Sequence, residues 1–167
     1  MAAGEESELR PIAPSDQRRM EAGIFNYGND MDVTNNPFQI TGLERLAELD
    51  NDNAFVSRAA LERIRSEGVH HKLVGVEIDG EPLRMWLEDF WPVTASGRTV
   101  GRLVSASHSP RLRINMGFAW VPVGSATPGT RISIDSPEGE RTATVTALPF
   151  LDPRKEIPAG MDRPAAG

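Results

Sequence analysis

The second half of the chain is divided into short β-type runs by turns rich in glycine and proline. Six runs are expected, at residues 72–78, 83–87, 99–105, 113–121, 130–134 and 141–148. The Asp79-Gly80 pair between the first two is a strong hairpin signal, because glycine tolerates the positive φ of tight turns. Short strands at regular spacing predict a small antiparallel barrel or sandwich that begins near residue 69.

The first 68 residues carry helix and loop signals instead. A short helix is expected over 17–22, after Asp16 and before Gly23, and a second over 58–67, capped by Ser57 and stopped at Gly68. Between them lies a long loop, residues 26–41, rich in Asn, Gly and Asp. Loops of this length in compact proteins are more often functional than idle. The stretch 42–49 fits a helix or a strand equally well.

Composition excludes several classes of function. A chain of 167 residues holds one domain, or a small domain with a fragment of another. Without cysteine it has no disulfide and no thiolate metal site, and the adjacent His70 and His71 point to opposite sides of an extended chain, so we expect no metal. The net charge of -6 argues against a nucleic-acid partner. No apolar run could span a membrane and the N-terminus is no secretory signal, so a cytoplasmic protein is expected.

Three stretches, in order along the chain, carry a family pattern. The first is Arg19-Met20-Glu21-Ala22-Gly23 with Tyr27-Gly28-Asn29-Asp30, and the second is Phe55-Val56-Ser57-Arg58-Ala59-Ala60-Leu61. The third is the β-rich half, with Lys72-Leu73-Val74-Gly75, Met116-Gly117-Phe118-Ala119-Trp120-Val121-Pro122 and Pro128-Gly129-Thr130 among its landmarks. Single pieces are weak, but so many in the correct order are specific, and together they resemble the glycine cleavage T-protein (aminomethyltransferase) superfamily.

The resemblance implies a fold in which a folate-binding module of two related α/β subdomains stacks with a C-terminal barrel around tetrahydrofolate. The fold class expected here is therefore α+β, the C-terminal fragment of an α/β folate-binding module followed by a small antiparallel β-barrel. Residues 1–68 would be the remnant of that module with a linker helix, 69–153 the barrel, and 154–167 a disordered tail. The implied activity is one-carbon transfer to tetrahydrofolate, the implied cofactor, from a small one-carbon donor.

Two departures from the family pattern qualify this activity. The family's catalytic aspartate and a folate-binding glutamate lie closer to the N-terminus than this chain begins. We therefore assign no catalytic residue and expect a catalyst that is incomplete alone, with a complementary N-terminal chain or a homo-oligomer as partner. Ser15 takes the place of the arginine in the aminomethyltransferases' Ala-Arg-Asp segment, which favours demethylase-like relatives of the dimethylsulfoniopropionate or aryl O-demethylase type. In the barrel, the family's common Thr-Ser-Gly is Ser105-Ala106-Ser107.

Five residues are candidates for contact with the folate. Arg19 could hold a folate carboxylate or a pteridine carbonyl through its donor fork, or pair with Asp16 or Glu21 on the helix surface. Glu21 could bond loop backbone or orient Arg19. Asp30 could serve as an acid–base group, although an Asx turn is favoured for a loop aspartate.

The other two candidates are aromatic. Tyr27 is the only tyrosine, in a polar loop, and could stack on a ring of the folate or donate its hydroxyl to the substrate. Trp91 stands where the family has Tyr-Pro and could offer an aromatic platform, although such aromatics are mostly packed in a core or an interface. An alternative from another class is a barrel without chemistry of its own, which associates with a partner chain.

Overall fold

The computed structural model describes residues 15–84 and 87–157. Two α-helices and three short 3-10 turns accompany six strands. In chain order they are α1 (Asp16–Glu21), η2 (Pro37–Gln39), η3 (Glu44–Leu46), α2 (Arg58–Glu67), β1 (His71–Ile78), β2 (Trp91–Ala95), β3 (Arg98–Ser109), β4 (Ile114–Pro122), η4 (Val123–Ser125), β5 (Arg131–Ser136) and β6 (Gly139–Thr146).

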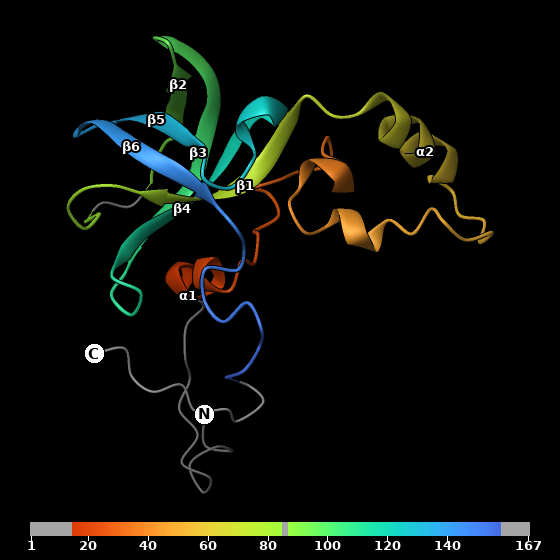
Figure 1. The fold of residues 1–167 in the computed structure, drawn as a ribbon, viewed down its shortest axis with the longest axis horizontal. Coiled ribbons are helices and arrows are strands. Elements are labelled where there is room, and N and C mark those ends of the chain that lie inside the picture. Colours follow the sequence, from red (N-terminus) through yellow and green to blue (C-terminus); the bar gives the residue numbers. More distant parts are fainter. Residues whose placement is uncertain (1–14, 85–86, 158–167) are drawn as a thin grey trace, which may run out of the picture.

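The six strands close into one antiparallel barrel in the order β1-β4-β3-β2-β5-β6 (Figure 1). β1 pairs with β4 from His71↔Pro122 to Ile78↔Asn115, and closes the barrel through β6 from Gly75↔Thr146 to Ile78↔Ala143. The pairing of β3 with β4 shifts between Leu103 and Ser105, so that Val104 is an extra residue on β3. Of the two alternatives, a barrel and a sandwich, the barrel is confirmed.

Strands β1, β3 and β4 pack on both of their faces. Alternate side chains such as Val76, Leu103 and Val121 fill the barrel interior, where all three are fully buried. The other face carries a second cluster, which includes Leu73, Phe118 and Trp120 and packs against Met20 of α1 and Ile40 of the following loop. β4 therefore reads as a nearly continuous apolar run, because neither of its faces meets water. β1 and β3 are buried on both faces only in part, and β3 begins with exposed residues.

One of the six expected strands lies elsewhere. The run expected at 83–87 is irregular at residues 83, 84 and 87, while its residues 85–86 lie outside the described part of the chain. The strand that sequence analysis missed is β2, where Pro92 obscured the pattern. Pro92 pairs only with Arg102 of β3, since β5 reaches no further than Val93 and Thr94, so its missing N–H leaves no ladder bond unmade.

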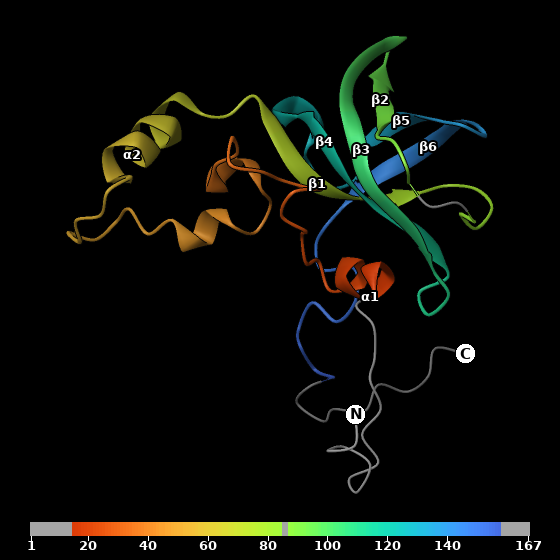
Figure 2. The ribbon, with the colours of Figure 1, turned by 180° about the vertical axis from the view of Figure 1, so that it is seen from behind.

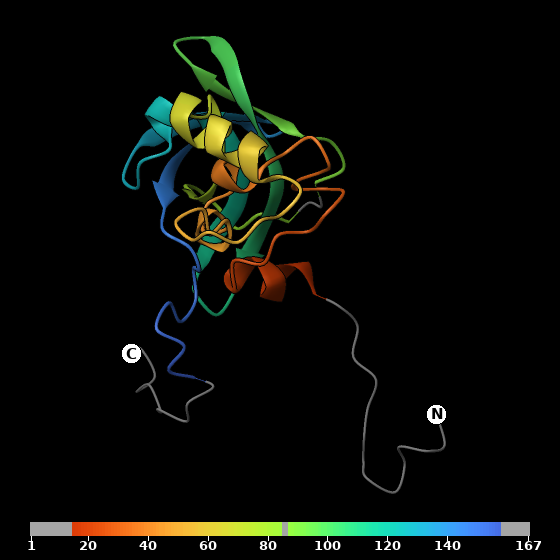
Figure 3. The same ribbon diagram turned by 90° about the vertical axis from the view of Figure 1, so that its right-hand side faces the viewer.

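Residues 50–69, which include α2, form an arm beside the barrel. Figures 1 and 2 show α2 standing apart from the barrel, whereas α1 lies against its lower end. Figure 3 views the molecule from the side of α2. The helix expected over 58–67 is confirmed, and it ends at Gly68 with φ 80°, but Ser57 makes no side-chain cap bond. No residue of α2 is buried, and Val56 just before it is fully exposed.

The expected fold class is therefore confirmed for the barrel, whereas the described residues before it do not show the expected fragment of an α/β folate-binding module. None of the helices described is long and apolar enough to cross a membrane.

Close backbone approach at Gly101 of β3 yields the first prediction. A Cβ at this position would lie 2.0 Å from the Trp120 carbonyl oxygen of β4, and backbone cannot move aside as a side-chain tip can. We expect Gly101→Ala to lower the free energy of unfolding by about 3 kcal/mol, measured by urea denaturation. Gly124→Ala is the matched control, because nothing lies within 4 Å of its Cβ, and equal losses in both variants would contradict the close approach.

Candidate functional site

The site begins with α1, a helix of six residues that could not persist alone in water. Ser15 stands at its N-cap, where the side chain accepts from the Arg18 amide. Its inner face buries Met20 and Glu21 against the outer surface of the barrel. Packing against the barrel therefore stabilises the helix, and it fixes the positions of the helix side chains next to β3.

Glu21 is one of the links that hold α1 in place. It is 5% exposed, and its carboxylate accepts from the Ser109 hydroxyl at 2.6 Å and from the Gln17 side-chain amide at 3.0 Å. Its backbone carbonyl accepts from the Leu151 amide at 2.8 Å. Neither expected role of the Glu21 side chain is found among the described contacts, because its carboxylate bonds the side chains of Ser109 and Gln17 and not loop backbone or Arg19.

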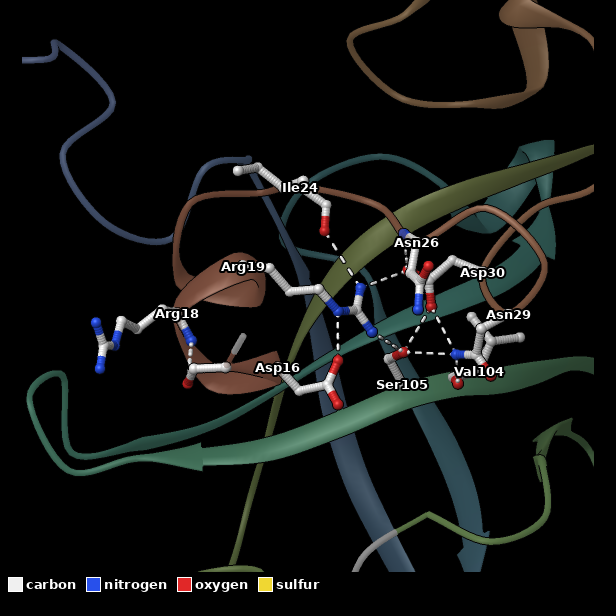
Figure 4. A network of polar contacts seen from close by, with 10 residues as sticks. Asp16, Arg18, Arg19, Ile24, Asn26, Asn29, Asp30, Val104 and Ser105 are labelled. Carbon is white, nitrogen blue, oxygen red and sulfur yellow. Dashed lines mark hydrogen bonds and ion pairs between the residues drawn. The ribbon is translucent and has the colours of Figure 1, made fainter. Parts of the chain in front are cut away.

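Arg19 projects from α1 into a group of four acceptors (Figure 4). Its Nε donates to Asp16, and Nη1 donates to Asp30 at 2.6 Å and to the Ile24 carbonyl at 3.2 Å. Its Nη2 donates to the Ser105 hydroxyl at 3.0 Å. The guanidinium carries five N–H bonds, so four are used and one on Nη2 remains.

Asp30 lies at the centre of this group and is 1% exposed. One carboxylate oxygen accepts from Arg19 and from the Asn26 amide at 2.7 Å, and the other accepts from the Ser105 hydroxyl at 2.5 Å and from Asn29 at 3.0 Å. The expected Asx turn is wrong, because the backbone donor lies four residues earlier and not two residues later. Asx turns are typical of exposed loops, whereas Asp30 is buried, and a buried carboxylate needs the opposite charge that Arg19 provides.

Two residues of the site were not predicted as contacts. The two N–H bonds of Asn29 Nδ2 are shared among three acceptors, Asp30, the Val104 carbonyl and the Ser105 hydroxyl, each at 3.0 Å. Ser105 was noted only for its place in a family tripeptide, and its burial could not be foreseen without the register of β3. Trp120 adds a third connection, since its indole N–H donates to the Asp30 carbonyl at 2.9 Å.

The charge at Arg19 is already matched. Two carboxylates, Asp16 and Asp30, contact one guanidinium, so a third carboxylate there would meet an anionic surrounding. What Arg19 offers a ligand is its remaining N–H, which suits a neutral acceptor such as a carbonyl. The expectation that Arg19 pairs with Asp16 is confirmed, and its pairing with Glu21 is not found among the described contacts.

A pocket of about 650 Å³ opens beside the cluster. Polar and apolar residues line it, and they come from α1, the loop after it, the segment after β1 and strand β3: Ser15, Asp16, Gln17, Arg19, Met20, Asn26, Asn29, Leu83, Arg84, Leu87, Val104, Ser105, Ala106 and Ser107. This volume lies within the range of small-molecule sites. The pocket thus lies between the first part of the described chain, around α1, and strand β3 of the barrel.

The aromatic candidates lie elsewhere. Tyr27 is 62% exposed on the loop beyond the cluster, and no contact of its hydroxyl is described. Trp91 is 5% exposed and packs inside the barrel with Val93 and Leu103, which agrees with the packing alternative. The structure does not bring either ring to the pocket that holds Arg19.

One carboxyl near the site has a shifted pKa. The Thr34 hydroxyl, and after it the Thr34 amide, donates to Asp32 and lowers the pKa of this exposed group. Among residues 15–84 and 87–157, no group of three His, Cys, Asp or Glu side chains could hold a metal ion.

Comparison with known proteins gives consistent results for sequence and fold. The family model of the glycine cleavage T-protein C-terminal barrel domain matches residues 71–152. Dimethylsulfoniopropionate demethylase DmdA of Ruegeria pomeroyi is 33% identical over 144 residues, 86% of this chain and 38% of that protein. An aminomethyltransferase of Synechococcus sp. (strain WH7803) is 34% identical over 139 residues, 83% of this chain and 37% of that protein.

A solved structure shows the same fold. The glycine cleavage system aminomethyltransferase T of Bartonella henselae superposes with a TM-score of 0.66 at 21% identity, and the match covers 83% of this chain and 38% of that one. The chain therefore spans less than two-fifths of the length of each of these three proteins.

Asp30 provides the test of the cluster. We expect Asp30→Asn to lower the free energy of unfolding by about 3 kcal/mol, because an amide cannot balance Arg19 and turns two hydrogens toward groups that are themselves donors. Thermal and urea unfolding measure the loss. Asp32→Asn is the control, since Asp32 lies two residues away on the surface. An Asp30→Asn chain as stable as wild type would show that the ion pair contributes nothing.

Proposed function

The chain belongs to the glycine cleavage T-protein superfamily through its C-terminal barrel domain, and on this premise we propose that it is the C-terminal portion of a tetrahydrofolate-dependent aminomethyl- or methyltransferase. The observation that carries the proposal is the Arg19 cluster, which borders a pocket of about 650 Å³. In this proposal α1, its loop and β3 supply one wall of the folate site, and the barrel supports that wall from behind.

The residues of the pocket fit such a ligand. Bound tetrahydrofolate would supply the nitrogen that accepts the one-carbon group. Arg19 would donate its remaining N–H to a neutral acceptor, so of the two groups first considered, the pteridine carbonyl suits it better than a folate carboxylate. Met20, Leu83 and Leu87 give the pocket apolar surface against which a ring can lie.

Proton transfer is not assigned to this wall. Asp30 is held by four donors and balanced by Arg19, so its carboxylate is committed to structure. In the proposed enzyme, the carboxylate that manages the proton belongs to a complementary folate-binding part. Positioning of the folate then becomes the contribution of this chain, and positioning alone accounts for a large share of catalysis in such reactions.

Ser15 supports a donor of the demethylase type. It caps α1 and lines the pocket, at the place where the aminomethyltransferases carry an arginine. A serine leaves that position of the pocket without a charge. Identity to the demethylase and to the aminomethyltransferase is nearly equal, so Ser15 is the residue on which this preference depends. A cytoplasmic location remains a prediction.

Calorimetry tests the proposal. We expect this chain alone to bind tetrahydrofolate no more tightly than about millimolar, because one wall of a pocket recovers little of the cost of association. Together with a separately expressed folate-binding module, taken from the preceding part of a full-length relative, it should bind in the micromolar range. Micromolar binding by the chain alone would overturn the claim that it is incomplete.

The same titration separates Arg19 from its neighbour. In the assembly of this chain with the folate-binding module, Arg19→Lys should weaken binding about tenfold. A lysine ammonium has three N–H bonds, so it cannot bond three acceptors of the cluster and also donate to a ligand in the pocket. Arg18→Lys is the matched control on the exposed side of α1. Equal affinity in the two variants would remove Arg19 from the site.

The arm around α2 favours a second function, association with another chain. A ten-residue helix without a buried side chain, next to exposed Phe55 and Val56, leaves apolar surface that nothing in the described chain covers. Such a surface suits a barrel module that associates with a partner chain or with a second copy of itself.

Light scattering after size exclusion distinguishes this second function. It predicts a dimer or larger species at micromolar concentration, which Val56→Asp converts to a monomer without a change in the melting temperature of the barrel. A compact wild-type monomer would count against self-association, and the folate-binding proposal would be unaffected.

A further inference from the structure

We propose that Ser105 of β3 is a positioning residue, which fixes the orientation in which Arg19 faces the pocket and so makes ligand binding depend on the barrel. The inference rests on the proposed function for the identity of the ligand, and on the cluster alone for the role of Ser105.

The first step is the chemistry of one hydroxyl. Ser105 Oγ donates to Asp30 at 2.5 Å and accepts from Arg19 Nη2 and Asn29 Nδ2, each at 3.0 Å. A serine hydroxyl has one donor and two acceptor positions, so all three are used. The residue is 5% exposed, which leaves water little access to replace any of these bonds.

The second step is that Ser105 holds both members of the ion pair at once. By donating to one oxygen of Asp30 it fixes the carboxylate plane, which presents the other oxygen to Arg19 Nη1. By accepting from Nη2 it occupies one hydrogen there and leaves the second for the pocket. Among the described residues, Ser105 is the one barrel side chain bonded to the side chains of both Arg19 and Asp30.

The third step is how the barrel aims this side chain. The register of β3 against β4 shifts at Val104, so that Ser105 faces Phe118 and lies on the outer surface under α1. A bulge of this kind redirects the side chain that follows it. Ser107 also lines the pocket, but its hydroxyl bonds to the His108 carbonyl and contacts neither Arg19 nor Asp30.

These contacts define the variants. Ser105→Ala removes the hydroxyl, Ser105→Thr retains it in a residue that strands favour, and Ser107→Ala removes a hydroxyl of the same pocket outside the cluster. The first readout uses the chain alone and needs no ligand. We expect the Arg19 guanidinium N–H signals in nitrogen-15 NMR spectra to show slow rotation in wild type, in Ser105→Thr and in Ser107→Ala, and fast rotation in Ser105→Ala.

The second readout is tetrahydrofolate affinity in the assembly with the folate-binding module. We expect Ser105→Ala to weaken binding about tenfold, and Ser105→Thr, which keeps the hydroxyl, to stay within about twofold of wild type. Slow Arg19 rotation together with unchanged affinity in Ser105→Ala would overturn the inference. If the wild-type assembly binds no tetrahydrofolate, the proposed function fails, whereas the NMR readout still decides whether Ser105 positions Arg19.

Discussion

The buried ion pair between Arg19 and Asp30 is the interaction on which the part outside the barrel depends. Asp30 is enclosed by the outer face of β4 and by its own loop, and a carboxylate in such a place requires a balancing charge. Arg19 supplies it from α1, a helix too short to form without support. The Arg19–Asp30 ion pair thus connects the helix, the loop and the barrel, and all three are needed to keep it buried.

Periodicity and turn chemistry predicted most of the strands. They missed β2, where a proline is tolerated because only one neighbouring strand pairs with it. The five strands that match an expected run each differ from it by about one to four residues at an end, and Pro92 hid β2 because its ladder bond is not needed there. In the site, Arg19 was identifiable from the family pattern, and Asp30 from that pattern and from its place in a long polar loop. Ser105 was not, since only the shift at Val104 turns it toward them.

The pocket is a product of both halves of the chain. Its polar residues Asp16 and Asn29 precede the barrel, whereas Ser105 and Ser107 lie at the middle of the longest strand. Outer packing of Met20 and Phe118 brings these segments together, and Phe118 also lies 5.9 Å below the guanidinium of Arg19. The apolar cluster on the outside of the barrel therefore has a role beyond stability, because it sets the distance between the two sides of the site.

The closed barrel also limits how this chain can meet others. Each of its strands has a neighbour on both sides, so the described sheet has no whole strand with a free edge at which another polypeptide could add a strand. A contact with another chain would therefore be made by side chains, and the arm around α2 offers exposed apolar ones at Phe55 and Val56. If this arm associates with another chain, as proposed above, the fit between side chains decides which chain binds, because no backbone pairing is involved.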